Sequence, residues 1–312
     1  MEIEKLRGNG GKERRGAERM KLSTMCIRCL MDRQEERVRG IGDEEKRASF
    51  LKKVAGIIAS AEEEDSAPCL VYEINQVYES LFGGLKSYEK EKKEFNALML
   101  ELEEEMDKDI RSGKDAKAIL KNAINYARTG NYIDFGAMNH VDKEQLLELL
   151  HKAKWEEVDE HTFAMLTEEL GAAKELVYLL DNCGEIVADK LLIKVIQEQY
   201  PEIHITVVAR GMEVLNDAVI EDANDVGLTK IVEVIGNGNG IAGTQINKLS
   251  KEARTVLDKA DIIISKGQGN FETIHGCGRN IYYLFLCKCE WFSERFGMER
   301  LKGVFINEKN LA

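Results

Sequence analysis

The chain has 312 residues, of which 44% are hydrophobic and 32% charged, and it contains only 2 prolines. This length suits one large domain or two joined subdomains, and the composition excludes collagen-like, proline-rich and mucin-like proteins. The net charge of −12 argues against nucleic acid as a partner, because a phosphate backbone repels an excess of carboxylates.

The apolar runs of the sequence are short. The run over 281–287 is much shorter than the ~20 residues that cross a bilayer, and no signal segment opens the chain. We therefore expect a cytoplasmic protein with no membrane partner. The seven cysteines are an odd number without a secretion signal, so we expect reduced thiols or metal ligands rather than disulfides.

Residues 1–19 are rich in glycine and charge and lack periodic apolar positions, which predicts a disordered tail. Over 20–174 the apolar residues recur three or four positions apart, which predicts a helical subdomain. The Glu and Lys residues of 86–109 are typical of a solvated helix face. The expected helices are 24–39, 43–63, 68–82, 86–109, 114–128, 142–154 and 161–174.

After residue 175 the apolar period changes to short, nearly continuous segments, most of them separated by stretches of helical period. Strands of this kind, alternating with helices, predict a mostly parallel sheet covered on both faces. We therefore expect residues 175–312 to form a three-layer α/β/α catalytic subdomain. The expected strands are 176–180, 203–209, 231–235, 262–265, 281–286 and 304–306.

Ligands of an open parallel sheet bind beyond the carboxyl ends of its strands. The first expected strand runs into Asp181 and Asn182, whose oxygen atoms suit a divalent ion such as Mg²⁺. Capping of the following helix is the simpler interpretation of an isolated Asp-Asn pair. The second strand is followed by Arg210, which suits a phosphate, and by Asp217, which is placed to share the ion with Asp181.

The fourth strand leads into Lys266 and the glycine-spaced segment 267–272. Backbone amides of such a loop can approach an anion while the ammonium supplies charge. The G-x-G-x-x-G pattern of 238–243 follows the third strand rather than the first, so we interpret 236–243 as a flexible loop and not as a dinucleotide site.

Cys26 and Cys29 form a C-x-x-C pair within an expected helix. The absence of a surrounding strand-helix-strand pattern argues against a redox pair. Buried thiols that pack as small hydrophobic groups are the favoured interpretation, and a half zinc site completed by Cys287 or Cys289 is the alternative.

At these positions the sequence resembles the metal-dependent damage-control phosphatases, a family long catalogued as a domain of unknown function. The resemblance covers nearly the whole chain from about Met20. Besides the cysteine pair, the matching motifs are Gly130-Asn131-Tyr-Ile-Asp134-Phe, Asp181-Asn182-Cys-Gly184-Glu185, Arg210-Gly211, Asn216-Asp217, Asp222-Ala-Asn-Asp-Val-Gly227 and Lys266-Gly267-Gln-Gly269-Asn270-Phe-Glu272. The implied fold is a multi-helical N-terminal array joined to an α/β/α domain.

The resemblance implies that one divalent ion, Mg, Mn, Co or Ni, is held by Asp181, Asn182 and Asp217. It implies that Lys266 and Arg210 face the substrate phosphate and that Asp181 and Lys266 are catalytic. The nucleophile is either a water on the metal or the Asp181 carboxylate. The residues implied to line the pocket are Asn131, Glu185, Asn270 and Glu272.

The implied activity is hydrolysis of phosphate monoesters of small metabolites, either sugar phosphates or damaged phosphorylated cofactor intermediates. The expected partner is therefore a phosphorylated small molecule. The alternatives are a carboxyl methyltransferase and a non-catalytic, metal-dependent metabolite-binding protein. Turnover of a phosphate ester, or binding of a methyl donor, distinguishes these functions.

Overall fold

The computed structural model describes residues 22–130, 157–297, 299–300 and 302–311. The predicted tail 1–19 and the predicted helix 142–154 lie outside these ranges. Within them, every helix is too short or too polar to span a lipid bilayer.

The described residues 22–130 and 157–174 are mainly helical, as their apolar period predicts. Ser23 and Asp43 cap the first two helices by accepting hydrogen bonds from the backbone N–H groups of Cys26 and Lys46. The second helix ends at Ala59, earlier than predicted. The helices are α1 (Thr24–Val38), α2 (Glu44–Ala59), α3 (Ala67–Phe82), α4 (Glu89–Arg111), α5 (Ala116–Gly130) and α7 (Glu160–Leu170).

A six-stranded sheet forms the centre of the second half, in the order β3-β2-β1-β4-β5-β6. The first five strands are parallel and β6 runs antiparallel to β5. The predicted mixed α/β fold with a mostly parallel sheet is confirmed. The strands are β1 (Glu175–Leu179), β2 (His204–Ala209), β3 (Glu233–Gly236), β4 (Ile262–Lys266), β5 (Ile281–Leu286) and β6 (Gly303–Asn307).

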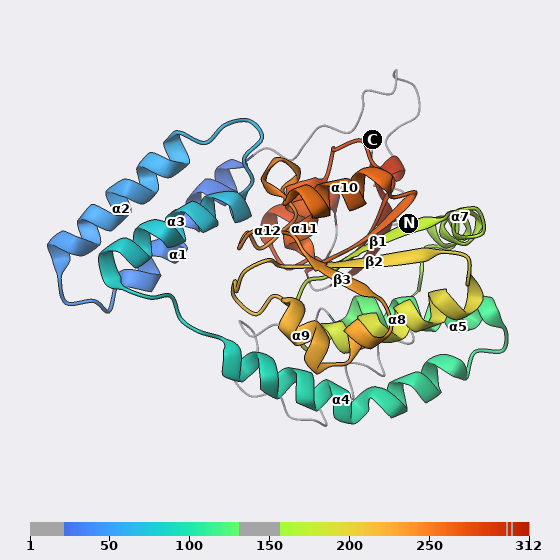
Figure 1. The fold of residues 1–312 in the computed structure, drawn as a ribbon. Coiled ribbons are helices and arrows are strands. Elements are labelled where there is room, and N and C mark those ends of the chain that lie inside the picture. Colours follow the sequence, from blue (N-terminus) through green and yellow to red (C-terminus); the bar gives the residue numbers. More distant parts are fainter. Residues whose placement is uncertain (1–21, 131–156, 298, 301, 312) are drawn as a thin grey trace, which may run out of the picture.

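Alternate residues of the strands face two separate hydrophobic cores. Leu176 and Tyr178 pack with α5 and with α8 (Glu185–Gln199), whereas Val177 and Leu179 face the opposite side of the sheet. That opposite side is covered by α10 (Lys251–Lys259), α11 (Gln268–Ile274) and α12 (Glu290–Phe296), as Figure 1 shows. The burial of both faces accounts for the continuous apolar strands.

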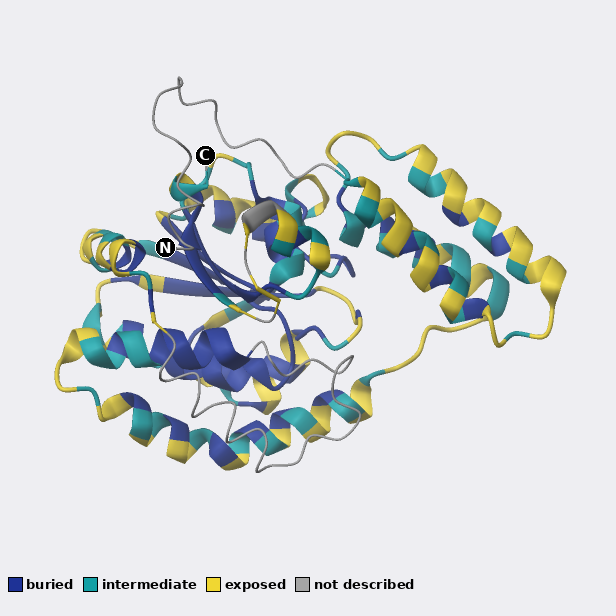
Figure 2. Cartoon of the chain, turned by 180° about the vertical axis from the view of Figure 1, so that it is seen from behind, coloured by how far each residue is buried: buried dark blue, intermediate teal, exposed yellow. Residues whose placement is uncertain are grey.

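The helical half belongs to two different cores. Helices α1–α3 enclose a small core of their own around Phe50, and their outer faces are exposed in Figure 2. Helices α4, α5 and α7 contribute Met99, Leu120 and Phe163 to the core beneath the sheet. Packing therefore places these three helices with the sheet, although their composition resembles that of α1–α3.

The order of the strands reverses between β1 and β4, because the chain adds β2 and β3 on one side of β1 and β4 and β5 on the other. At such a switch point the loops leave the sheet in opposite directions and leave room for a ligand. Asp181 follows β1 and Gly267 follows β4, so both lie at this point of the sheet.

The separate core of α1–α3 predicts that this unit can open by itself. Phe50 is fully buried and packs edge-on against Tyr78 and Phe82. We expect Phe50→Ala to cost about 3–5 kcal/mol through the cavity that it creates. Hydrogen exchange should then show loss of protection over 24–82 while β1–β5 stay protected. Equal loss of protection in the strands would show instead that the two cores unfold as one.

Candidate functional site

Two loops at the switch point bring Asp181 and Asp217 together. The backbone N–H of Ala218 donates to the carbonyl of Asp181 at 2.7 Å, and that of Cys183 donates to the carbonyl of Asn216 at 2.9 Å. These bonds form a short antiparallel bridge between the segment after β1 and the segment after β2. The predicted placement of the two carboxylates in adjacent loops therefore agrees with the structure.

The guanidinium of Arg210 links these two carboxylates. Its Nε donates to Asp217 Oδ2 at 2.6 Å, and its Nη2 donates to Asp181 Oδ1 at 3.4 Å. Its Nη1 donates to Asn270 Oδ1 at 2.8 Å and to the carbonyl of Gly243 at 3.1 Å. Only 2% of Arg210 is exposed. In this arrangement the arginine fixes the carboxylates, and Nη2, with the longest of these bonds, is its most weakly held donor.

Asn182 joins the same cluster from beside Asp181. Its Nδ2 donates to Asp181 Oδ2 at 2.6 Å and to Glu185 Oε2 at 3.1 Å. These bonds leave the carbonyl oxygen of the amide as the atom that can face a cation. Asn182 does not supply the N-terminal side-chain cap of α8, whose N-cap residue is Gly184.

The ammonium of Lys266 lies on the other side of Glu185. It donates to a carboxylate oxygen of Glu185, to Asp189 Oδ1 at 2.5 Å and to the backbone carbonyl of Ala127 at 2.8 Å. Burial lowers the pKa of Lys266, but the two carboxylates outweigh this effect and the net pKa is raised. All three N–H groups of a lysine thus have acceptors. A contact with phosphate requires one of these bonds to be given up, so the phosphate role of Lys266 stays a prediction.

Asn270 forms part of the framework of the site. Its Nδ2 donates to the carbonyls of Leu180 and Lys266, and its Oδ1 accepts from Arg210 and from the Thr244 hydroxyl. The side chain is fully buried. Its hydrogen-bonding groups therefore hold β1, β4 and Arg210 together, where we expected it to line the pocket.

The other two predicted lining residues have different positions. Glu272 is half-buried and accepts a hydrogen bond from Gln268 Nε2 at 2.6 Å on its own helix. Burial raises the pKa of Glu272. Asn131 lies outside the described residues.

Negative charge is concentrated at the site. Burial, and then the charges of Asp217 and Glu185, raise the pKa of Asp181 to about 7. Burial also raises the pKa of Asp217, although Arg210 opposes the effect. The buried cluster holds more carboxylates than cations, and its charged members are Asp181, Glu185, Asp189, Asp217, Arg210 and Lys266. Such a charge balance, with carboxylate and amide oxygens side by side, fits a divalent cation.

Gly267 makes this close packing feasible. Its φ is +78°, and a Cβ added there would lie 2.0 Å from Asp181 Oδ2. A side chain would thus both strain the backbone and displace the carboxylate. The glycine spacing after β4 accordingly serves the Asp181 carboxylate, whereas we expected it to serve an anion.

The segment 236–243 is anchored, which corrects our interpretation of it as a flexible loop. Asn237 is fully buried, and its backbone N–H donates to the carbonyl of Ala209 at 2.9 Å. Its side chain accepts from the Gly211 N–H and donates to the Gly243 carbonyl. The next regular element is a 3-10 turn, Ile246–Lys248, and not an α-helix, so the dinucleotide fingerprint is absent here.

Lys288 is a cation near the cluster that the sequence motifs do not mark. It lies just beyond β5, which neighbours β4, and its positive charge lowers the pKa of Asp181. Its side chain is half-buried. The rule that ligands bind beyond strand ends, applied to the fifth strand as well, would have identified it.

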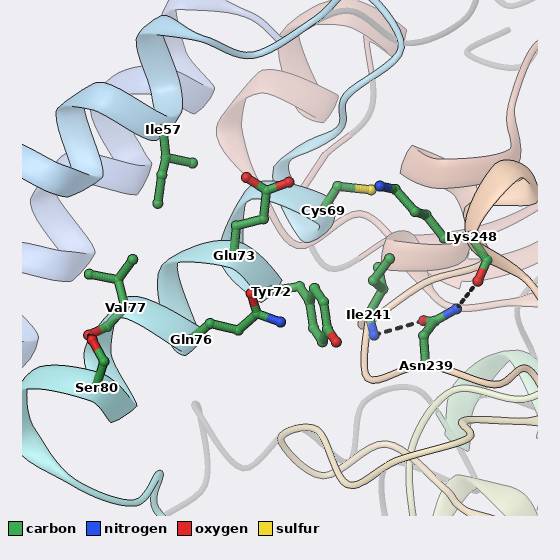
Figure 3. Close-up of a pocket in the computed structure, with 10 residues that line it drawn as sticks. All are labelled: Ile57, Cys69, Tyr72, Glu73, Gln76, Val77, Ser80, Asn239, Ile241 and Lys248. Atoms are coloured by element: carbon green, nitrogen blue, oxygen red, sulfur yellow. Dashed lines mark hydrogen bonds between the residues drawn. The ribbon is translucent and has the colours of Figure 1, made fainter.

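A cavity of about 610 Å³ lies between the anchored segment 236–243 and α3. Figure 3 shows the side chains that line it. None of the predicted site residues is among them, so this cavity is distinct from the carboxylate cluster. The lining residues are Ile57, Cys69, Tyr72, Glu73, Gln76, Val77, Ser80, Asn239, Ile241 and Lys248.

The interpretation of the C-x-x-C pair as buried thiols is wrong for Cys29, which is exposed, while Cys26 is half-buried. In the described ranges, no group of three or more His, Cys, Asp or Glu side chains is placed to hold a metal ion. The alternative of a zinc site at these cysteines therefore has no support there. The cluster at Asp181 and Asp217 differs from such a group because its third ligand would be an amide.

Known proteins are similar to this chain in sequence and in fold. A family model described as the damage-control phosphatase ARMT1-like domain matches residues 22–302. A damage-control phosphatase of Archaeoglobus fulgidus is 30% identical over 284 residues, which are 89% of this chain and 96% of the relative. The damage-control phosphatase PH1575 of Pyrococcus horikoshii is 35% identical over 169 residues, 54% of this chain and 58% of the relative.

A solved structure agrees with these matches. The crystal structure of a DUF89 family protein (PH1575) from Pyrococcus horikoshii superposes with a TM-score of 0.75 at 26% identity. The superposition covers 93% of this chain and 99% of that protein. The family match extends over the described α-helices and strands β1–β5, and we conclude that the chain belongs to the damage-control phosphatase family with an ARMT1-like domain.

Proposed function

We propose that this protein is a metal-dependent phosphatase that hydrolyses phosphate monoesters of small metabolites, either sugar phosphates or damaged phosphorylated cofactor intermediates. The observation that carries the proposal is the pair of buried aspartates, Asp181 and Asp217, held by Arg210 at the switch point of the sheet. The family supports the phosphatase class. The cluster of oxygen ligands with excess negative charge supports the metal.

In this proposal Asp181, Asn182 and Asp217 hold one divalent ion, Mg, Mn, Co or Ni. Such an ion polarises the phosphoryl oxygens and neutralises charge that develops during transfer. Arg210 keeps the two carboxylates at a fixed separation. Because the ligands are already in place, little reorganisation is needed when charge develops.

The cationic side chains near the cluster, Arg210, Lys288 and Lys266, orient the phosphate. Nη2 of Arg210 is bound to Asp181 at 3.4 Å, so it can turn toward a phosphate oxygen at little cost. Lys288 carries a second positive charge near Asp181 and is half-buried. Lys266 keeps Glu185 and Asp189 paired in the interior and supplies a third phosphate contact where one of its bonds is exchanged. The nucleophile is either a water or the Asp181 carboxylate.

Replacing Asp217 with Asn tests the metal site. The change keeps the shape of the side chain but removes one anionic ligand from the cluster, so a hard cation should bind much more weakly. We expect metal affinity and phosphate release to fall together. Calorimetric titration with Mn²⁺ and a phosphate-release assay over a panel of metabolite phosphates measure the two effects.

The matched control is Asp225→Asn, which removes the same charge at an exposed position at the end of α9 (Ile220–Asp225). It should leave both measurements unchanged. Equal metal affinity and turnover in Asp217→Asn and the wild type would show that the site has been assigned to the wrong residues.

Replacing Gly267 with Ala tests the close approach of Asp181. We expect a large loss of metal affinity, because the added Cβ would lie 2.0 Å from Asp181 Oδ2 and must displace it. Gly278→Ala is the control, since Gly278 has a φ of +79° and no atom within 4 Å of the added Cβ. Both glycines have a positive φ that L residues rarely adopt, so both variants carry backbone strain. If both lose affinity equally, strain and not contact with Asp181 is the cause.

A further inference from the structure

Helix α4 reaches both loops of the carboxylate cluster from outside the sheet. Its N-terminal part lies near the loops, and its later turns pack against α5 and α8 (Figure 1). We propose that Lys92 and Asn96 of α4 are positioning residues that hold the two halves of the metal site. This inference rests on the proposed metal site.

Lys92 binds both ends of the loop that carries Asp217. Its Nζ donates to the Glu213 carboxylate at 2.7 and 2.9 Å, and it pairs with Asp222 Oδ2 at 2.7 Å. Asp222 Oδ2 also accepts from the backbone N–H of Val219 at 2.9 Å. Glu213 precedes Asp217 in the chain and Asp222 follows it, so one ammonium fixes both ends of the loop.

Lys92 is buried, and burial of its ammonium is unfavourable. Only 2% of it is exposed, although it belongs to a helix whose other lysines are mostly on the surface. Burial lowers the pKa of Lys92, but its bonds to Asp222 and Glu213 outweigh the effect and the net pKa is raised. The ammonium is thus held in its charged form between two carboxylates. A lysine that only covered the core would leave its charge in water.

The loop needs such anchors because its own backbone is strained. Leu215 has a φ of +48°, a left-handed conformation that leucine rarely adopts, and the side chain is 47% exposed. Few contacts of its own therefore offset the strain. The bonds of Lys92 to Glu213 and Asp222, at the two ends of the loop, supply the stabilising contacts that the exposed tip lacks.

Asn96 holds the other loop. It lies one helical turn after Lys92 on the same face of α4, and its Oδ1 accepts from the Gly184 N–H at 2.6 Å. Gly184 has a φ of +78° and directly precedes Glu185. Asn96 Nδ2 is buried with no partner among the described residues. A buried orphan amide lowers stability, so the carbonyl acceptor is what this residue contributes.

Mn²⁺ titration of Lys92→Met tests the proposal. Loss of a group that orients metal ligands typically weakens metal binding by about 10–100-fold, and we expect a change in that range. The matched control is Lys190→Met. Lys190 is also buried and also connects α4 to the sheet domain, through Glu103 Oε2 and the Val226 carbonyl, both at 2.7 Å. It should lower the melting temperature without weakening Mn²⁺ binding.

Lys92→Arg keeps the charge and should recover part of the affinity. If Lys92→Met does not fold, Asn96→Ala decides in its place, with weaker Mn²⁺ binding expected. Unchanged affinity in the folded variants, or an equal loss in Lys190→Met, would overturn the positioning role and leave the proposed function intact. A wild-type protein that binds no Mn²⁺ or other divalent ion would overturn the metal site itself.

Discussion

The bonds of Arg210 are the interaction on which the site depends. One guanidinium binds acceptors from four segments: Asp181 after β1, Asp217 after β2, Gly243 after β3 and Asn270 in α11. A buried charge of this kind is tolerated only where nearly every donor has a partner, and here the partners are distributed over three loops and the start of α11. The positions of these loops are thus coupled, and removal of any one partner weakens the hold on the others.

Sheet topology explains why these three loops and the start of α11 can meet. With the order β3-β2-β1-β4-β5-β6, the carboxyl ends of β1 and β4 lie side by side, and the loops after β2 and β3 fold toward them from one side. Gly267 then allows the Asp181 carboxylate to pack directly against the start of α11. The fold contributes a place where carboxylates from separate strands converge, and the sequence fills that place with two aspartates and one arginine.

The sequence predicts the fold and the main charged residues of the site, but not the bonds between them. Apolar periodicity distinguishes the helices from the strands, and the strand-end rule then identifies Asp181, Asp217 and Arg210. The rule gives the neighbourhood of a side chain but not its partners, so it did not predict the bonds by which Arg210 and Asn270 hold the loops together. Lys92 and Asn96 escaped notice because α4 is rich in Glu and Lys, and a buried lysine there has the same pattern as a solvated one.

The buried negative charges that would attract a cation also destabilise the folded protein when no cation is bound. Burial and neighbouring carboxylates raise the pKa of Asp181 to about 7, above its ordinary value of 3.8. Folding therefore disfavours the ionised form, so the stability of the cation-free protein falls as the pH rises from about 3.8 to about 7, and this group changes it no further above pH 7. The proposed cation would remove this penalty and stabilise the folded chain by an amount that grows with the logarithm of its concentration over its Kd. Arg210 and Lys266 offset only part of the negative charge, which leaves carboxylates able to attract the proposed cation.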